Sequence, residues 1–122
     1  MDRDELRERT KAFAHRCVKA ALALPENALG RHLRGQLIRS STGAAANYRA
    51  ACVAQSRAAF VAKLSIVVEE IGESCFWMEF ILEEELLARP KIAPLLAEGE
   101  ELRAIFVVAR CTTRKNQIPN TQ

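Results

Sequence analysis

Residues 56–87 have the sequence SRAAFVAKLSIVVEEIGESCFWMEFILEEELL, which is apolar at the spacing of an α-helix. At 100° per residue, one apolar stripe runs the length of this segment. Its members are Phe60, Leu64, Val67, Ile71, Cys75, Met78 and Leu82. Ser56 precedes the stripe and suits an N-cap, because its hydroxyl can accept from an unpaired amide of the first turn. We therefore predict one long helix over residues 56–87.

A second apolar stripe lies on the far side of the same helix. It contains Ile66, Trp77 and Phe80, interleaved with Glu69, Glu70, Glu73 and Glu84. Because one bundle core covers only one stripe, a monomer would leave the second in water. We expect another copy of the chain to cover it, through an interface that includes Ile66, Glu73, Trp77 and Phe80.

Three further segments share this period, at about residues 3–23, 28–53 and 95–115. Pro25 separates the first two, and Pro90 and Pro94 are expected in a loop before the last. The predicted inward positions are Leu6, Thr10, Phe13, Cys17, Ala21 and Leu24, then Leu29, Leu33, Leu37, Ser40, Ala44, Tyr48 and Ala51, then Leu95, Leu102, Phe106 and Ala109. Residues 116–122 are expected to be a frayed tail. The prediction is one domain over residues 1–122, an all-α, antiparallel up-down-up-down four-helix bundle.

The composition fits a helical domain and limits its chemistry. A chain of 122 residues can enclose a core without disulfides or metal. Cys17, Cys52, Cys75 and Cys111 are far apart and lack paired Cys/His spacing, which predicts small buried thiols and no metal site. No apolar leader follows Met1, and no run reaches the roughly 20 apolar residues that span a bilayer. We expect a soluble protein of the reducing cytoplasm.

The charge is small but unevenly distributed. The net charge is +3, yet residues 1–65 hold 12 Lys/Arg against 5 Asp/Glu, and residues 66–122 hold 6 against 10. Such asymmetry indicates a nucleic-acid face on the basic half, or charge pairing between halves of the same or neighbouring molecules.

Catalytic residues are scarce. His15 falls on the polar side of the first predicted helix and His32 near the start of the second. Both are interpreted as surface residues, since no nucleophile or orienting group accompanies them. The Glu83–Glu85 run lacks the Glu-x-x-His spacing of di-iron bundles and fits a solvated helix end. No phosphate-binding glycine loop is visible. We expect no enzyme and no cofactor.

Residues 39–49, RSSTGAAANYR, are the most distinctive part of the chain. Ser40, Asn47 and Tyr48 place polar groups beside or within the predicted core, where such groups must be paired. The favoured interpretation is tight helix packing near Gly43, with Asn47 hydrogen-bonded to a neighbouring helix. The alternative is a ligand site. The arginines of this helix, Arg31, Arg34, Arg39 and Arg49, are predicted to face outward.

Residues 39–82, from RSSTGAAANYR to CFWMEFIL, resemble the signature of a four-helix bundle family encoded in intervening sequences of bacterial large-subunit ribosomal RNA genes. The resemblance extends from Phe13 to the end of the last predicted helix. It is carried by Arg39 and Ser40, by the Asn-Tyr-Arg run at residues 47–49, and by the Lys-Leu pair at residues 63–64. Family members usually have a glutamate after the Asn-Tyr-Arg run, where this chain has Ala50.

The resemblance implies an up-down-up-down bundle that assembles into a homopentameric ring, with no established enzymatic activity. More distantly, the chain is similar to accessory proteins of diversity-generating retroelements, which are basic pentamers that contact RNA and a reverse transcriptase. That similarity adds RNA or DNA, and a reverse transcriptase, to the expected partners.

Two functions are therefore in competition. The first is a nucleic-acid-associated homo-oligomer whose backbone contacts come from Arg31, Arg34, Arg39 and Arg49. The second is a structural or protein-binding assembly, in which the same arginines face Glu69, Glu70, Glu73 and Glu84 of the next subunit. The two differ in whether the arginines stay exposed.

Overall fold

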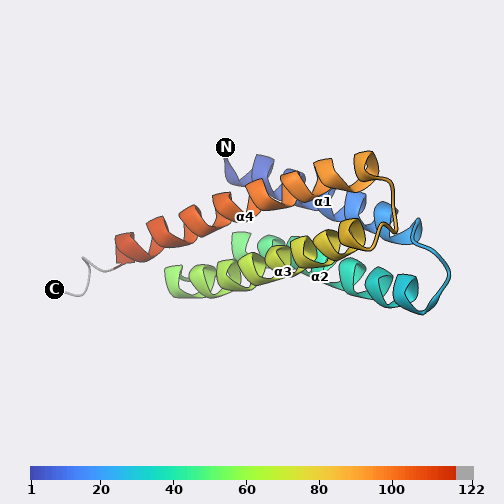
Figure 1. Ribbon diagram of the computed structural model, residues 1–122. Helices are drawn as coiled ribbons and strands as arrows, with labels where there is room; N and C mark the ends of the chain where they lie inside the picture. The colour runs from blue at the N-terminus through green and yellow to red at the C-terminus, as the bar shows by residue number, and fades with distance from the viewer. Residues whose placement is uncertain (118–122) are drawn as a thin grey trace.

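The computed structural model describes residues 1–117, which form four helices and no strand over that range. The helices are α1 (Arg3–Leu22), α2 (Ala28–Cys52), α3 (Arg57–Glu83) and α4 (Arg89–Gln117). Successive helices run in opposite directions, and each packs on two others, with α1 and α4 packed most sparsely (Figure 1). The predicted fold, an all-α antiparallel four-helix bundle, is confirmed.

Three helices begin at side-chain caps. The Asp2 and Asn27 side chains accept hydrogen bonds from the amides of Glu5 and Gly30, both at 2.8 Å. Ser56 is the predicted cap of α3, and its hydroxyl accepts from the Ala59 amide at 3.1 Å. These bonds satisfy first-turn amides that have no partner within the helix. They set starts that agree with the sequence patterns to within one residue.

The connection between α3 and α4 differs from the prediction at both ends. The third helix ends at Glu83 and not at residue 87, and the fourth begins at Arg89 and not at residue 95. Glu85 adopts a left-handed φ of 54°, and the amides of Glu85 and Leu86 donate to the carbonyls of Leu82 and Ile81. This pair of bonds closes the end of a helix.

Both prolines expected in a loop instead belong to α4. Pro90 lies in the first turn, where an amide would have no helical acceptor and the fixed φ of proline suits the helix. Pro94 lies inside the helix and removes one hydrogen bond near its start. The predicted tail also needs correction, because residues 116 and 117 extend α4; residues 118–122 lie outside the described range.

The core is built from the predicted stripes. All six inward positions predicted around α1 are buried, and those of the other helices are buried or half-buried. The half-buried ones are Leu29, Phe60, Leu82 and Ala109. Gly99 brings α4 close to its neighbours, since a Cβ there would lie 2.9 Å from the Cys75 sulfur and 3.1 Å from the Phe13 ring. The periodicity therefore identified most of the core, but not this close approach.

Candidate interaction surfaces

An aromatic cluster occupies the outer side of α3. We call Phe76, Trp77 and Phe80 the aromatic surface; the Phe76 ring lies 4.9 Å from Trp77 and 6.1 Å from Phe80. His32 of α2 meets the Trp77 ring edge-on at 5.7 Å, although it was predicted only as a surface residue. Phe76 is 51% exposed, which makes it the most exposed aromatic residue of the described chain.

Trp77 carries an unusual polar group. Its indole Nε1 is buried and has no hydrogen-bond acceptor among residues 1–117. A buried donor without an acceptor costs about 1–3 kcal/mol, so native structures rarely keep one. An exposed phenylalanine and an unpaired indole therefore adjoin on one surface.

The predicted interface residues divide between this surface and its flanks. Trp77 and Phe80 are half-buried within it, and Ile66 is 38% exposed about three helical turns away on α3. Glu73 is paired within the chain, as described below. Phe76 was not predicted as an interface residue, because its position falls between the two stripes that the helical period defines.

Two of the four predicted α2 arginines form ion pairs inside the chain. Arg39 pairs with Glu73 and, at 3.5 Å, with Glu70, both on α3. The Glu70 side chain covers Gly43, where any Cβ would collide with its carboxylate. The absence of a side chain at Gly43 therefore leaves room for the Glu70 carboxylate between α2 and α3.

Arg34 is also engaged. It pairs with Glu26 at 2.6 Å, and it donates to the carbonyls of Ala21 and Leu24 at 3.3 and 2.9 Å. Ala21 belongs to the last turn of α1, and Leu24 follows the end of that helix. Arg31 and Arg49 are exposed and form no ion pair with residues 1–117. Only these two remain available on α2 for an external anion.

The polar residues of the distinctive segment serve packing. The Ser40 hydroxyl lies 2.8 Å from that of Ser74, which joins α2 to α3 inside the core. Asn47 donates to the Gly43 carbonyl of its own helix at 2.9 Å, so the predicted bond to a neighbouring helix is wrong. Tyr48 is buried with its ring 4.8 Å from Phe106. Burial, followed by the contact with Cys52, raises the pKa of Tyr48 to about 12. Ala50 is half-buried.

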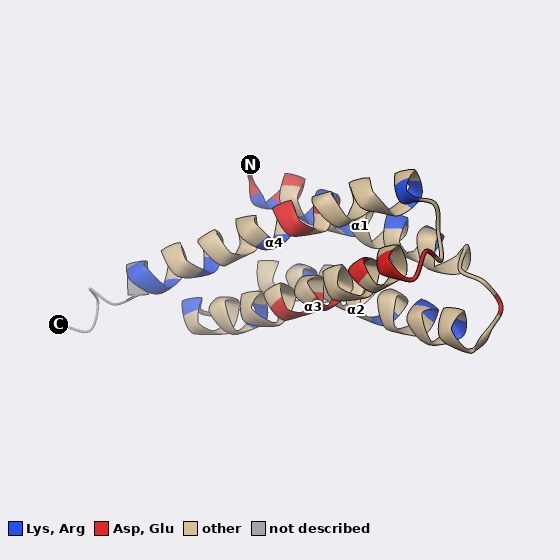
Figure 2. Cartoon of the chain, viewed as in Figure 1, with Lys and Arg blue, Asp and Glu red and all other residues tan. Residues whose placement is uncertain are grey.

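The bundle gathers cations at one end. We call this the basic end; it comprises the last turn of α2, the first turn of α3 and the last turns of α4. Figure 2 shows blue segments at the tips of α3 and α4 and red segments farther along α3. The cations are Arg49, Arg57, Arg110, Arg114 and Lys115. Arg3 and Arg57 also line one hollow there with Thr113 of α4.

The contribution of α4 to this end was not predicted. Residues 66–122 have a net negative charge, although three cations lie at the C-terminal end of α4. The predicted up-down-up-down order was the signal that could have found them, because it places the end of α4 beside the α2–α3 connection.

All four cysteines were predicted to be buried, and this prediction is wrong for two of them. Cys17 and Cys75 are buried, Cys52 is intermediate and Cys111 is exposed. Burial raises the pKa of the Cys17 thiol to about 12 and that of Cys75 to about 11. Since the thiolate is the reactive form, burial makes these two thiols less reactive at neutral pH than an exposed cysteine. Over residues 1–117, no three His, Cys, Asp or Glu side chains converge as metal ligands would.

No helix in the described part of the chain combines the length and the apolar character needed to cross a bilayer.

Together, the fold and surfaces define an all-α antiparallel bundle with an aromatic surface and a basic end. No protein-family model and no curated protein matches the chain. Among solved structures, the chain is similar to a protein of unknown function from the S23 ribosomal protein family of Bacteroides thetaiotaomicron. The two share 28% sequence identity with a TM-score of 0.77, over 86% of this chain and 97% of the other.

Proposed function

We propose that the protein is a non-enzymatic bundle that assembles with copies of itself and binds the phosphate backbone of RNA or DNA. The observation that carries the proposal is the basic end, where cations of α2, α3 and α4 lie at the same end of the bundle although they are far apart in the sequence. Side chains of Lys and Arg that contact phosphates give affinity without reading bases. Binding should therefore tolerate any sequence and weaken with salt.

The proposal also includes a family assignment. The solved S23-family structure resembles this chain over nearly its whole length. We propose that this chain belongs to that family, and that the family is the one encoded in intervening sequences of ribosomal RNA genes, with retroelement accessory proteins as distant relatives. On this proposal, the assembly is a homopentameric ring with RNA or DNA and a reverse transcriptase among its partners.

Assembly would multiply a modest charge. A single chain carries only +3, but a ring presents one basic end per subunit, so several weak phosphate contacts act together. Of the α2 arginines, Arg49 lies at the basic end, Arg31 lies near the other end of the helix, and Arg34 and Arg39 have partners within the chain. We therefore place the proposed nucleic-acid site at the basic end, and not on the α2 face that the sequence predicted.

The test replaces three cations of the basic end by glutamine: Arg49, Arg114 and Lys115. The matched control replaces Lys11, Lys19 and Lys91, which removes the same charge elsewhere. Binding of a labelled RNA and a labelled DNA is measured by fluorescence anisotropy from about 50 to 200 mM salt. The plot of log affinity against log salt should become shallower by about one unit for each phosphate contact removed.

The control variant should retain most of the affinity, and both variants must keep the particle size of the wild-type protein. The nucleic-acid proposal is abandoned if the wild-type protein binds neither polymer at about 50 mM salt. It is also abandoned if the two triple variants bind equally well.

A second candidate is a purely structural or protein-binding assembly. The specific observation in its favour is that Arg34 and Arg39 form ion pairs within the chain, while Phe76 of the aromatic surface is exposed. The pairing of Arg39 with Glu70 and Glu73 occurs within one subunit, so the arginine-glutamate contact expected between subunits has an internal alternative. Oligomers that form normally but bind no nucleic acid would favour this candidate.

A further inference from the structure

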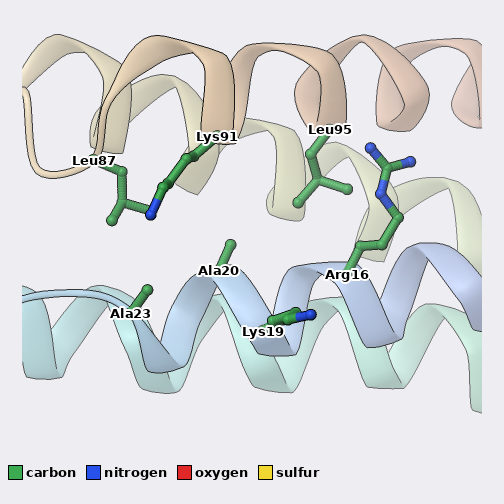
Figure 3. Close-up of a pocket in the computed structure, with 7 residues that line it drawn as sticks. All are labelled: Arg16, Lys19, Ala20, Ala23, Leu87, Lys91 and Leu95. Carbon is green, nitrogen blue, oxygen red and sulfur yellow. The ribbon is translucent and has the colours of Figure 1, made fainter.

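A groove separates α1 from α4 at the end of the bundle opposite the basic end. It has a volume of about 370 Å³ and is lined by Arg16, Lys19, Ala20, Ala23, Leu87, Lys91 and Leu95. Figure 3 shows Leu87 and Leu95 above the short side chains of Ala20 and Ala23. Two alanines opposite two leucines leave a gap, which agrees with the sparse packing of these helices. The floor of the groove is apolar.

Three cations surround this floor. Arg16 reaches up from α1 and Lys91 reaches down from α4 into the space between the helices, and Lys19 lies along α1 at the front of Figure 3. All three are exposed, and none forms an ion pair with residues 1–117. No carboxylate lines the groove. The two walls therefore present like charges to each other.

The same helix pair is arranged differently farther along. There, Arg9 of α1 binds Glu98 of α4 through two hydrogen bonds of 2.8 and 2.7 Å, and it also reaches Glu101 at 3.1 Å. Opposite charges close that part of the α1–α4 contact. The groove, by contrast, holds three cations that have no carboxylate partner among residues 1–117, which makes it a candidate site for an external anion.

The backbone adds to the positive potential. Lys91 lies in the first turn of α4, which contains no acidic residue. A helix N-terminus carries partial positive charge, so a cation there is unfavourable unless an anion is near. Lys91 consequently raises the positive potential at a place where helix stability alone would favour Asp or Glu.

We propose that this groove binds a small amphiphilic anion, with an apolar tail between Ala20 and Leu95 and a carboxylate or phosphate head at Arg16, Lys19 and Lys91. The volume falls within the range of about 300–1,000 Å³ that is usual for small-molecule sites, and the combination of apolar walls with few charged groups is typical of them. The site is independent of the aromatic surface and of the basic end.

The test uses four probes that share a decyl chain, each kept below its micellar concentration. Decanoate and decyl phosphate carry the two candidate heads, decanol has no charge, and decyltrimethylammonium has the opposite charge. Binding is measured by calorimetry and by amide shifts of Ala20 and Ala23. At least one anion should bind once per chain and shift these amides, whereas decanol should bind at least tenfold more weakly and the cation not at all.

Two variants test the residues. The double variant Lys19→Glu with Lys91→Glu should bind the preferred anion on the order of tenfold more weakly, since each rim ion pair contributes up to about 1 kcal/mol. Its matched control, Lys11→Glu with Arg31→Glu, changes the charge equally outside the groove and should bind almost normally. Ala20→Phe, which fills the groove, should abolish binding. Circular dichroism and thermal melting verify that each variant is folded.

The single tryptophan separates this site from the aromatic surface. Trp77 contacts His32 of α2 and Phe76 of α3, so its emission should stay constant when an anion enters the α1–α4 groove. The proposal is overturned if decanol binds as well as the anions, or if the double variant and its control bind alike. It is also overturned if the probes alter Trp77 emission without shifting Ala20, or if the Ala20 shift depends on protein concentration alone, which would place a second copy in the groove.

Discussion

Glu85 shows how one residue can hold a backbone conformation that its side chain disfavours. Its φ of 54° is left-handed, and its amide and that of Leu86 close the end of α3. Glycine commonly occupies this position because it lacks the Cβ that makes the conformation unfavourable, by roughly 1–2 kcal/mol for other residues. Glu85 also adds negative charge at a helix C-terminus, which opposes the helix dipole.

Glu85→Gly should therefore stabilise the protein, by about 1 kcal/mol in urea unfolding at neutral pH. Glu84→Gly is the matched control, because it removes the same charge one residue earlier, where φ is an ordinary −85°. The control should be neutral or destabilising, since glycine there only increases the entropy of the unfolded chain. Equal effects of the two substitutions would mean that charge, and not backbone strain, determines the stability of this turn.

At the residue scale, the candidate site was only partly predictable. Helical periodicity placed Trp77 and Phe80 on an outward stripe, but exposure depends on what packs beside them. His32 from α2 covers part of Trp77, and Phe76 remains the most exposed ring. Likewise, Asn47 found its acceptor in Gly43 of its own helix, a local bond that polar side chains in helices often prefer. The spacing of residues along one helix does not reveal which side chains of other helices, or which carbonyls, lie next to them.

At the element scale, the α1–α4 contact is the weakest of the four, and one ion pair anchors it. Arg9 and Glu98 form a bidentate pair, and the Glu98 side chain is only 20% exposed. The hydrogen bonds from Arg9 lower the pKa of Glu98 below its ordinary value of 4.5. The pair therefore stabilises the folded state only while Glu98 is ionised.

The expected consequence is a defined pH dependence. Because the folded pKa of Glu98 is depressed, its stabilisation is complete above the unfolded value of 4.5 and disappears as the pH falls through the lower folded value. Glu98→Gln should lower the free energy of unfolding by about 1 kcal/mol at pH 7, and the difference from wild type should be smaller at pH 3 than at pH 7. Urea titrations at both pH values, at one protein concentration, measure this.

Glu101→Gln provides the control, since Glu101 is 64% exposed and makes a single contact with Arg9 at 3.1 Å. Its effect should be a small fraction of that of Glu98→Gln. A difference between Glu98→Gln and wild type that persists unchanged at pH 3 would show that the pair does not act through ionisation.

The helices themselves were largely predictable, because burial repeats every three or four residues along each of them. Leu6, Phe13 and Cys17 illustrate this in α1, where every predicted inward residue is buried. The connection between α3 and α4 could not be predicted, since Pro90 and Pro94 are equally compatible with a loop and with the first turns of a helix. The left-handed backbone at residue 85 could not be predicted either, because the residue is a glutamate, whereas a glycine there would have indicated such a conformation.

At the scale of the whole molecule, antiparallel topology separates three surfaces. It brings the ends of α2 and α4 together at the basic end, leaves the cationic groove between α1 and α4, and sets the aromatic surface on the α2–α3 side. Such separation allows one chain to contact a copy of itself and a polyanion without competition between them. The aromatic surface is the part that an assembly should cover, because its exposed ring and buried indole donor are both unfavourable in an isolated chain.

Phe76→Glu should consequently weaken self-association. Burying a phenylalanine contributes about 1.5–3 kcal/mol, so its loss should raise the dissociation constant roughly tenfold to a hundredfold for each interface. Light scattering at micromolar concentration should show the mass falling towards the 13.6 kDa of one chain. Because Phe76 is half exposed, this substitution tests the interface with little damage to the core, whereas Trp77→Glu would disturb both.

Leu22→Glu is the matched control, since Leu22 is 65% exposed at the end of α1 and lies outside the aromatic surface. It should leave the mass unchanged. A wild-type protein that is monomeric at micromolar concentration, or a Phe76→Glu oligomer of undiminished mass, would show that α3 does not join subunits through these aromatic side chains.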